Sequence, residues 1–326
     1  MPEPGFSNPT RSVSLDFREY LRQRQFELDR HMTGGIPDYA FSLDASIRSK
    51  LASVRLLRTI GQAVNAATVP IQRQMLLMNG VAVGPQQFPQ IHALGEACAR
   101  TLGIGIPQIF IVAESTPNAY TYCTNDIDQI IVLTSGLVES LKAEDELKFV
   151  IGHECGHIHN QHVVYNTIWE LTVNPLAHGT LQAAIKLTPG LGAIAPLLQQ
   201  LTNIALWYVF RRWHRCAEIT SDRAGLICCG DRQAAMNALG KLTYGGIQAL
   251  QGFNPEAYAD QARRAEQSPL LFKALFQDHP SGPERVESLR LFAECEVFKF
   301  WRPEAQAPAP YRGKPAVDAE CENLVR

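Results

Sequence analysis

The sequence predicts an α+β protein that is mainly helical and contains one small β-sheet. Apolar residues recur at helical spacing in most long segments, as they do from residue 89 to 102. Two short β-branched runs, 108–112 and 129–134, are flanked by Pro, Asn and Gly and predict two strands of one sheet. With 326 residues and 46% apolar composition, the chain can bury a large core in one domain or two closely joined ones.

Charge and cysteine usage limit the classes of function. A formal net charge of −2 argues against a nucleic-acid partner, since no basic run stands out. The eight cysteines form no C-x-x-C pair and are expected to be reduced thiols. No basic and apolar leader precedes the first helix, so we expect a cytoplasmic protein. The sequence leaves open whether identical chains assemble into an oligomer.

The N-terminal quarter predicts a supporting helical region. Residues 1–12 are expected to be flexible, and 13–84 to form an N-terminal helical region with helices at 15–30 and 43–66. The apolar, glycine-punctuated run 75–84 predicts a strand and a turn.

The following segment, 85–302, contains the chemistry-bearing motifs. The helix predicted at 89–102 ends at Gly103, and a short helix follows at 136–141. Three acidic residues at 144–146 then begin another helix, where they suit its positive end. Further along, Asp231 is expected to cap a helix. The Pro/Ala-rich remainder, 303–326, predicts a C-terminal tail.

Residues 187–210 contain no charged side chain and are long enough to cross a bilayer. However, Pro189, Pro196 and several Gln, Asn and Gly residues interrupt the run. We therefore favour a buried or dimer-facing helical hairpin, with a membrane span as the alternative.

An H-E-x-x-H motif at 153–157 predicts a zinc site. On a helix, His153 and His157 lie on one face and can direct both imidazoles at one ion. Glu154 stands where it can act as a general base without ligating the metal. The neighbouring His159 and His162 are expected to face solvent or to support the ligands, and Cys155, Cys228 and Cys229 to be small core residues.

A catalytic zinc site needs a third protein ligand. Glu218 is the best candidate, because a Glu-x-x-x-Asp pattern places it on one helix face with Asp222. Small residues on the same helix, Ala217, Ser221, Ala224 and Gly225, let it approach closely. Asp222 would then orient a ligand histidine. From the residues alone, a solvated face beside Arg215 and Arg223 is the competing interpretation.

Taken together, these motifs resemble zinc endopeptidases of the HtpX and CAAX prenyl protease type, within the gluzincins. The resemblance covers roughly residues 85–300 and rests on four landmarks in order. They are Asn118-Ala119-Tyr120, the segment leading into 153–157, the helix with Glu218 and Asp222, and the late His279-Pro280 with Arg285. It implies a zincin-type domain in which the H-E-x-x-H helix faces a second ligand helix.

The resemblance also implies a role for each matching residue. His153, His157 and Glu218 would ligate one Zn²⁺ per chain, Glu154 would be the general base, and Asp222 would hold His153. A polypeptide substrate would pair with the edge formed by Asn118, Ala119 and Tyr120. His279 and Arg285 would lie near the metal and stabilise the oxyanion or contact the substrate.

One hypothesis concerns the resting state. Because His279 is predicted on a Pro/Gly-bounded loop and a neutral histidine is a common ligand, its imidazole could occupy the open zinc position and displace water.

The sequence thus predicts a zinc-dependent endopeptidase that hydrolyses peptide bonds with activated water, in a role such as protein quality control. Two alternatives are a zinc-bearing chaperone-like binding protein and a membrane-anchored protease that uses 187–210. An intact Glu154 argues against a pure binder, which needs no base.

Overall fold

The computed structural model describes residues 31–33, 35–124, 127–173, 204–244, 252–265, 280–305 and 310–325. The chain forms two compact units, 1–38 and 39–326. In the first, strands β1 (Met32–Thr33) and β2 (Ile36–Pro37) pair antiparallel. Gly35 between them has a φ of 79°, which glycine adopts without strain. The predicted flexible segment 1–12 and the helix predicted at 15–30 lie outside the described residues.

The second unit begins with two helices where the sequence predicts one. Helix α2 (Ser42–Ser53) and helix α3 (Arg55–Asn79) are separated by Val54, whose φ and ψ of −84° and 82° are not helical. Of the run 75–84, predicted as a strand and a turn, only Val81–Ala82 forms a strand, because α3 continues through Pro70 to Asn79. Met and Leu favour helix, and only Leu76 of the run 75–78 is buried, so the run lacks the two-residue alternation of a half-buried strand.

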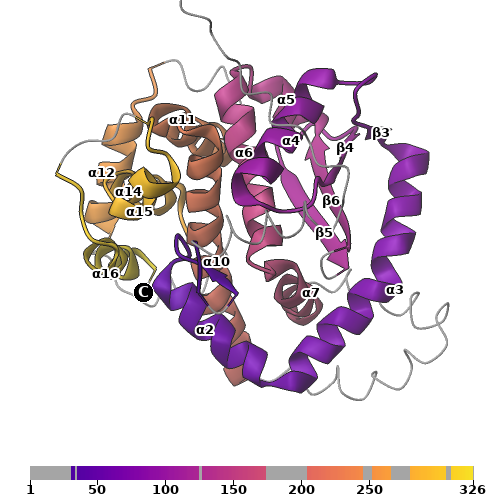
Figure 1. Cartoon of the computed structure of the whole chain (residues 1–326), viewed down its shortest axis with the longest axis horizontal. Helices are drawn as coiled ribbons and strands as arrows, with labels where there is room; N and C mark the ends of the chain where they lie inside the picture. Colours follow the sequence, from indigo (N-terminus) through magenta and orange to yellow (C-terminus); the bar gives the residue numbers. More distant parts are fainter. Residues whose placement is uncertain are drawn as a thin grey trace, which may run out of the picture. The chain divides into compact units, whose positions relative to one another are not determined.

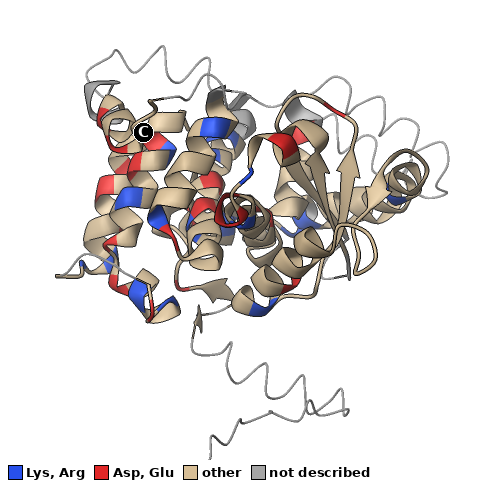
Figure 2. Ribbon diagram, turned by 90° about the horizontal axis from the view of Figure 1, so that it is seen from above, with Lys and Arg blue, Asp and Glu red and all other residues tan. Residues whose placement is uncertain are grey.

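A four-stranded sheet lies at the centre of this unit, in the order β3-β4-β6-β5. Strands β4 (Gln108–Val112) and β6 (Ile127–Thr134) pair in parallel, which confirms the two predicted strands. Strands β3 (Val81–Ala82) and β5 (Ala119–Thr124) add antiparallel on the two sides. Neither β4 nor β5 carries a charged residue (Figure 2). Strand β5 ends the strand order and is therefore an edge of the sheet.

Helices next to the sheet follow the prediction closely. Helix α4 (Pro89–Leu102) ends at Gly103, whose φ is 70°, as expected for a glycine after the last turn. Helix α5 (Ser135–Ser140) follows β6 directly, and the Thr134 side chain accepts a hydrogen bond from the backbone N–H of Leu137. Helix α6 (Glu144–His159) then crosses the unit between the sheet and α10 (Figure 1).

The remaining described helices pack beyond α6. Asp231 caps α11 as predicted, since its carboxylate accepts the backbone N–H of Ala234. Helices α12, α14, α15 and α16 gather near α11 and the far side of α10 (Figure 1). The elements are α7 (His162–Val173), α10 (Ile204–Cys229), α11 (Arg232–Tyr244), α12 (Pro255–Ala265), α14 (Gly282–Ala293), α15 (Glu296–Trp301) and α16 (Lys314–Leu324).

Helices α6 and α10 approach each other closely because glycines line their contact. A β-carbon on Gly152 would lie 2.5 Å from the β-carbon of Cys228, and one on Gly156 would lie 2.6 Å from that of Ala224. In return, a β-carbon on Gly225 would lie 2.7 Å from the Phe149 carbonyl oxygen. Larger side chains at these positions would hold the two helices apart.

The C-terminal helix α16 is part of the packed unit, although it lies in the segment predicted as a tail. Its Val317, Cys321 and Leu324 are buried. Asp318 forms a 2.7 Å ion pair with Arg223 of α10, which is fully buried. This pair joins the last helix to the helix that carries the candidate ligand Glu218.

No helix within the described ranges combines the length and the apolar composition that a bilayer span requires. Most of the segment considered for a span, 187–203, lies outside those ranges, and 204–210 form the first turns of α10.

Candidate metal centre and active site

Helix α6 presents the H-E-x-x-H motif in its C-terminal half. Its first turn contains Glu144, Asp145 and Glu146, whose charges suit the partly positive N-terminus. His153, Glu154 and His157 are 7%, 5% and 6% exposed, so the motif lies in a buried site rather than on a solvated helix face.

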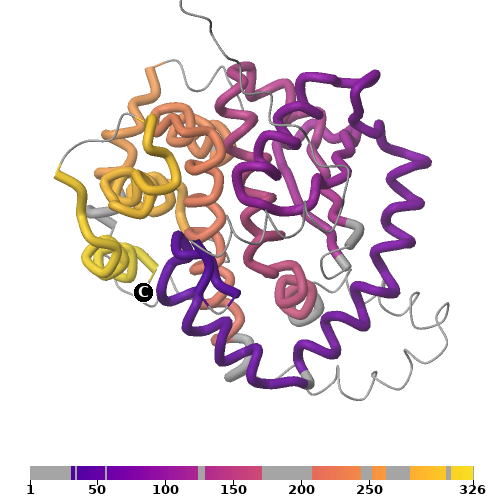
Figure 3. Tube along the Cα trace, in the orientation of Figure 1, coloured from indigo at the N-terminus to yellow at the C-terminus, as the bar shows by residue number. Residues whose placement is uncertain are grey.

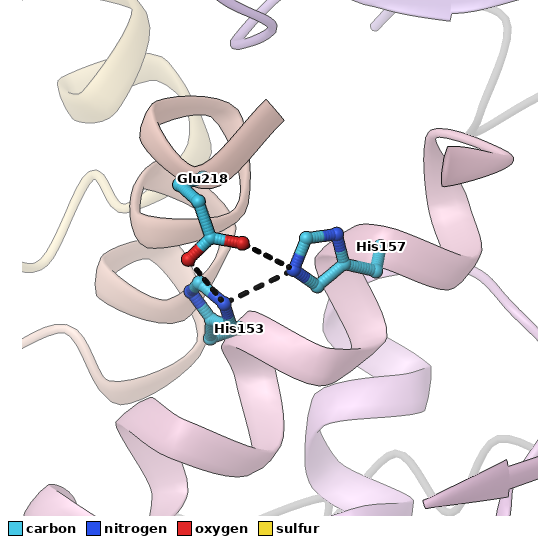
Figure 4. Close-up of side chains that lie close together, drawn as sticks. All are labelled: His153, His157 and Glu218. Carbon is cyan, nitrogen blue, oxygen red and sulfur yellow. Dashed lines mark hydrogen bonds and ion pairs between the residues drawn. The ribbon is translucent and has the colours of Figure 1, made fainter. Parts of the chain in front are cut away.

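Glu218 of α10 lies directly opposite the two histidines. Its carboxylate oxygens are 3.4 Å from Nε2 of His157 and 3.7 Å from Nε2 of His153, and the two Nε2 atoms are 3.1 Å apart (Figure 4). The short interhelical distance at Gly152 and Gly156 permits this approach.

These three side chains form a group of potential metal ligands, with one donor atom from each within 4.8 Å of the others. Atoms bound to one zinc ion at about 2.0–2.1 Å and tetrahedral angles lie roughly 3.3 Å apart. The three measured separations surround that value. Two histidines and a glutamate are also a ligand set that catalytic zinc uses, so the residues fit a zinc ion.

His153 is held from behind by a carboxylate. Its Nδ1 lies 2.9 Å from Oδ1 of Asp222, which is fully buried one turn beyond Glu218. Arg285 of α14 donates to both oxygens of Asp222, at 2.8 and 2.6 Å, and its guanidinium lies 3.4 Å from Glu218. Burial raises the pKa of Asp222, but Arg285 and His153 outweigh that effect and hold the pKa below 3.8.

His157 is held by a second histidine. Its Nδ1 lies 3.1 Å from Nδ1 of His162, at the start of α7, and Nε2 of His162 lies 3.1 Å from Oδ2 of Asp44 in α2. Burial lowers the pKa of His162 to about 4, so the ring is neutral near pH 7. Burial raises the pKa of Asp44, but His162 and Arg48 outweigh that effect, and the pKa stays below 3.8.

The carboxylate of Glu154 is bound to the edge strand. The Thr121 hydroxyl of β5 donates a 2.5 Å hydrogen bond to Oε2 of Glu154. The general base predicted from the motif is thus tied to the strand that borders the cleft.

One side of the β5 backbone pairs with no strand among the described residues. The carbonyl of Asn118 accepts the N–H of Thr134 in β6, and its amide oxygen accepts the N–H of Ala119 at 2.9 Å. Because backbone groups alternate in direction along a strand, the Ala119 carbonyl and both backbone groups of Thr121 point away from β6. Tyr120 pairs inward and packs against Tyr122 at a ring distance of 5.4 Å.

A cleft of about 1200 Å³ surrounds these groups. Strand β5 and helices α3 and α7 line one part of it, and residues of α11, α12 and the start of α14 line another. His153, Glu154, His157 and Glu218 all contribute to its lining, as do the predicted edge residues 118–120 and Arg285.

Of the remaining predicted residues, His279 lies outside the described ranges, which resume at Pro280. His159 is hydrogen-bonded through Nδ1 to the Tyr39 hydroxyl at 2.9 Å, away from the ligands. Cys155, Cys228 and Cys229 are buried, as predicted.

Sequence reasoning missed Thr121 and Asp44. Thr121 follows the edge motif by one residue, and a two-residue alternation from Ala119 would have placed both side chains on one face. Asp44 lies 118 residues before its partner His162, and no spacing signal links them.

Comparisons with known proteins agree with this geometry. The model of peptidase family M48 matches residues 85–293. The plastoglobule-localized metallopeptidase 48 of Arabidopsis thaliana is 29% identical, over 82% of this chain and 76% of its own length. The protease HtpX homologue of Thermococcus sibiricus is 29% identical, over 66% of this chain and 77% of its own. Protease HtpX of Nitrosococcus oceani is 28% identical, over 76% and 86%.

Among solved structures, Ste24p of S. mikatae aligns with a TM-score of 0.43 and 18% identity, covering 83% of this chain and 66% of its own. At that score the alignment adds nothing to the assignment. The family match spans more than half of the chain and includes His153, His157 and Glu218. The resemblance inferred from the four landmarks is therefore confirmed: this chain is a metallopeptidase that belongs to peptidase family M48.

Proposed function

We propose that the protein is a zinc-dependent endopeptidase that binds one Zn²⁺ per chain through His153, His157 and Glu218. The observation that carries the proposal is the convergence of two imidazole nitrogens and a carboxylate at 3.1–3.7 Å in a cleft that also contains Glu154. A zinc ion held there supplies Lewis-acid chemistry, because it polarises a carbonyl oxygen and lowers the pKa of a water molecule.

Glu154 moves the proton. Its carboxylate accepts a proton from the attacking water as the oxygen bonds to the scissile carbonyl carbon, and it passes that proton to the leaving amine as the C–N bond breaks. The hydrogen bond from Thr121 fixes one carboxylate oxygen and favours a single orientation of the base. No group of the protein is acylated.

The substrate is a polypeptide in extended conformation. The Ala119 carbonyl and the backbone of Thr121 offer hydrogen-bonding groups at the cleft, and an extended chain satisfies such groups by adding a strand. Asn118 contributes by fixing the N–H of Ala119, and Tyr120 by packing the strand against the sheet. A role in protein quality control belongs to this proposal on the family resemblance alone.

Arg285 is assigned to holding carboxylates. Its guanidinium donates to both oxygens of Asp222 and lies 3.4 Å from Glu218, so its charge is already balanced by groups that orient the ligands. This arrangement favours a positioning role for Arg285 over direct contact with substrate.

The test compares the native chain with Glu154→Gln. Zinc content is measured by mass spectrometry, and cleavage with a library of peptides whose termini are blocked, so that only internal bonds can be cut. We expect both proteins to contain one zinc per chain and only the native chain to cleave. Glu144→Gln, an exposed change on the same helix, is the matched control and should cleave normally.

Two results would contradict the proposal. Native-rate cleavage by Glu154→Gln would remove the general base from the mechanism. Zinc binding without cleavage of any peptide by the native chain would favour the chaperone-like alternative. Partition of the protein into membranes on cell fractionation would favour the membrane-anchored alternative. It would not contradict the proposed hydrolysis mechanism.

A further inference from the structure

Three buried side chains form a line that leads away from the ligand group. Nδ1 of His157 lies 3.1 Å from Nδ1 of His162, and Nε2 of His162 lies 3.1 Å from Oδ2 of Asp44. His162 and Asp44 are fully buried, and His157 is 6% exposed. Each residue comes from a different helix: α6, α7 and α2.

The positions of the protons on the two imidazole rings follow from the ionised carboxylate of Asp44. An ionised carboxylate only accepts hydrogen bonds, so Nε2 of His162 must be the N–H that donates to Asp44. A neutral imidazole with its proton on Nε2 has a lone pair on Nδ1. Nδ1 of His162 therefore accepts, and Nδ1 of His157 donates. The lone pair of His157 is left on Nε2, the atom that lies 3.4 Å from Glu218.

We infer that Asp44 is a positioning residue for the metal centre: acting through His162, it fixes His157 in the tautomer that directs the Nε2 lone pair at the metal. The inference rests on the proposed function, because it requires a metal ion at this site.

The surroundings of Asp44 support this role. The Thr220 hydroxyl donates to Oδ2 of Asp44 at 2.7 Å and accepts the backbone N–H of Phe41 at 3.1 Å. Thr220 lies on α10 between the ligand Glu218 and Asp222, so the helix that supplies the third ligand also fixes the far end of the line. The carboxylate oxygen that accepts from His162 is thus also held by a side chain of α10.

Each of the two ligand histidines is therefore oriented by a buried carboxylate, directly for His153 and indirectly for His157. Asp222 accepts directly from Nδ1 of His153, whereas Asp44 acts on His157 through one additional imidazole. A ligating imidazole whose other nitrogen donates to such a partner is fixed in tautomer and orientation.

This assigns a function to a region that the sequence leaves unassigned. Asp44 lies outside residues 85–293, which match the family model. Helix α2 packs against α10, the helix that carries Glu218 (Figure 3). The N-terminal helices would then be a part of the metal centre and not only its support.

The experiment measures zinc affinity of the full-length protein after chelator treatment, by competition with a chromophoric chelator. We expect His162→Leu and Asp44→Ala to weaken zinc binding roughly 10- to 100-fold, the usual effect of removing such a partner. His162→Asn should retain most of the affinity, because its side-chain oxygen can accept from Nδ1 of His157. Thr167→Val is the matched control, because it removes a part-buried hydrogen bond from α7 to Asn65. This variant should bind zinc as tightly as the native chain does.

A second measurement reads the tautomer without any substitution. Long-range ¹H–¹⁵N spectra of histidine-labelled native protein, assigned by substitution at the other histidines, should show His157 protonated on Nδ1 and His162 on Nε2. A His157 ring without a proton on Nδ1 overturns the inference, even where a variant fails to fold.

The two proposals fail in different ways. If the native chain binds zinc and cleaves peptides while folded His162→Leu binds zinc equally well, the role of Asp44 is refuted and the proposed function stands. If the native chain binds no zinc, both are refuted.

Discussion

Substitution of Gly156 by alanine tests whether the spacing of α6 and α10 sets the metal geometry. An added β-carbon would lie 2.6 Å from the β-carbon of Ala224 and 3.1 Å from the α-carbon of Ser221. Carbon atoms in favourable contact are about 3.5–4.0 Å apart. The helices must therefore separate by roughly 1 Å, which moves Glu218 away from His153 and His157 by a similar amount.

The expected loss of stability is modest, while the expected loss of activity is large. Overpacking costs about 1–3 kcal/mol of unfolding free energy, and the better helix propensity of alanine returns about 1 kcal/mol. A misplacement of about 1 Å at a catalytic site can lower the rate by about 10²-fold. We therefore expect kcat/KM of Gly156→Ala to fall by roughly that factor in a chain that remains folded.

A double-mutant cycle separates spacing from other effects. Ala224→Gly removes the nearest obstructing atom, so it should recover at least tenfold of the lost kcat/KM in the Gly156→Ala background, although alone it costs about 1 kcal/mol of stability. Gly84→Ala, where an added β-carbon meets nothing within 4 Å, is the control. Native kcat/KM in Gly156→Ala, or no recovery in the double mutant, would refute the reasoning.

Further predictions concern the C-terminal helix and the metal. Asp318→Asn leaves the guanidinium of Arg223 buried without its charged partner, so urea titration should show a loss of about 3 kcal/mol; an unchanged midpoint would contradict this. Burial raises the pKa of Asp318, but Arg223 holds it below 3.8, so the pair stabilises the fold above that pH and its contribution is lost as the pH falls further. Acid unfolding of Asp318→Asn should therefore depend less on pH below about 4 than that of the native chain. Chelation should abolish cleavage and lower Tm while far-UV circular dichroism is preserved, because the apolar core does not depend on the metal; added zinc should reverse both changes.

Local sequence patterns are sufficient to predict the helices and strands around the motif and the pairing of its residues. The helix at 89–102 was predicted from apolar spacing and a terminal glycine, and strands β4 and β6 from β-branched runs. His153 and His157 could be paired because their spacing of four is one helical turn, and Glu218 with Asp222 for the same reason. In each case the information lies within a few residues.

Predictions failed where tertiary packing decides the conformation. Residues 75–78 are all apolar, so neither helical nor strand periodicity distinguishes them, and the structure buries only Leu76, in a cluster with Phe110 and Val132 of the sheet. The Pro/Ala-rich segment predicted as a tail contains α16, whose buried face becomes visible only once Arg223 is known to lie opposite Asp318. Asp44 is a single acidic residue in an ordinary helical sequence, and only the fold brings it to His162.

Helix α10 joins these observations into one arrangement. Glu218 and Asp222 are four residues apart and share the face that meets α6, where one reaches the ligand histidines and the other holds His153. Thr220 lies halfway between them, so its side chain points roughly 200° from Glu218 around the helix, towards α2 and Asp44. Because a single helix carries Glu218, the partner of His153 and the Thr220 side chain that holds Asp44, we expect a shift of α10 to disturb all three candidate ligands together. We therefore expect glycine at position 156 to matter for the metal geometry as well as for the packing of α6 against α10.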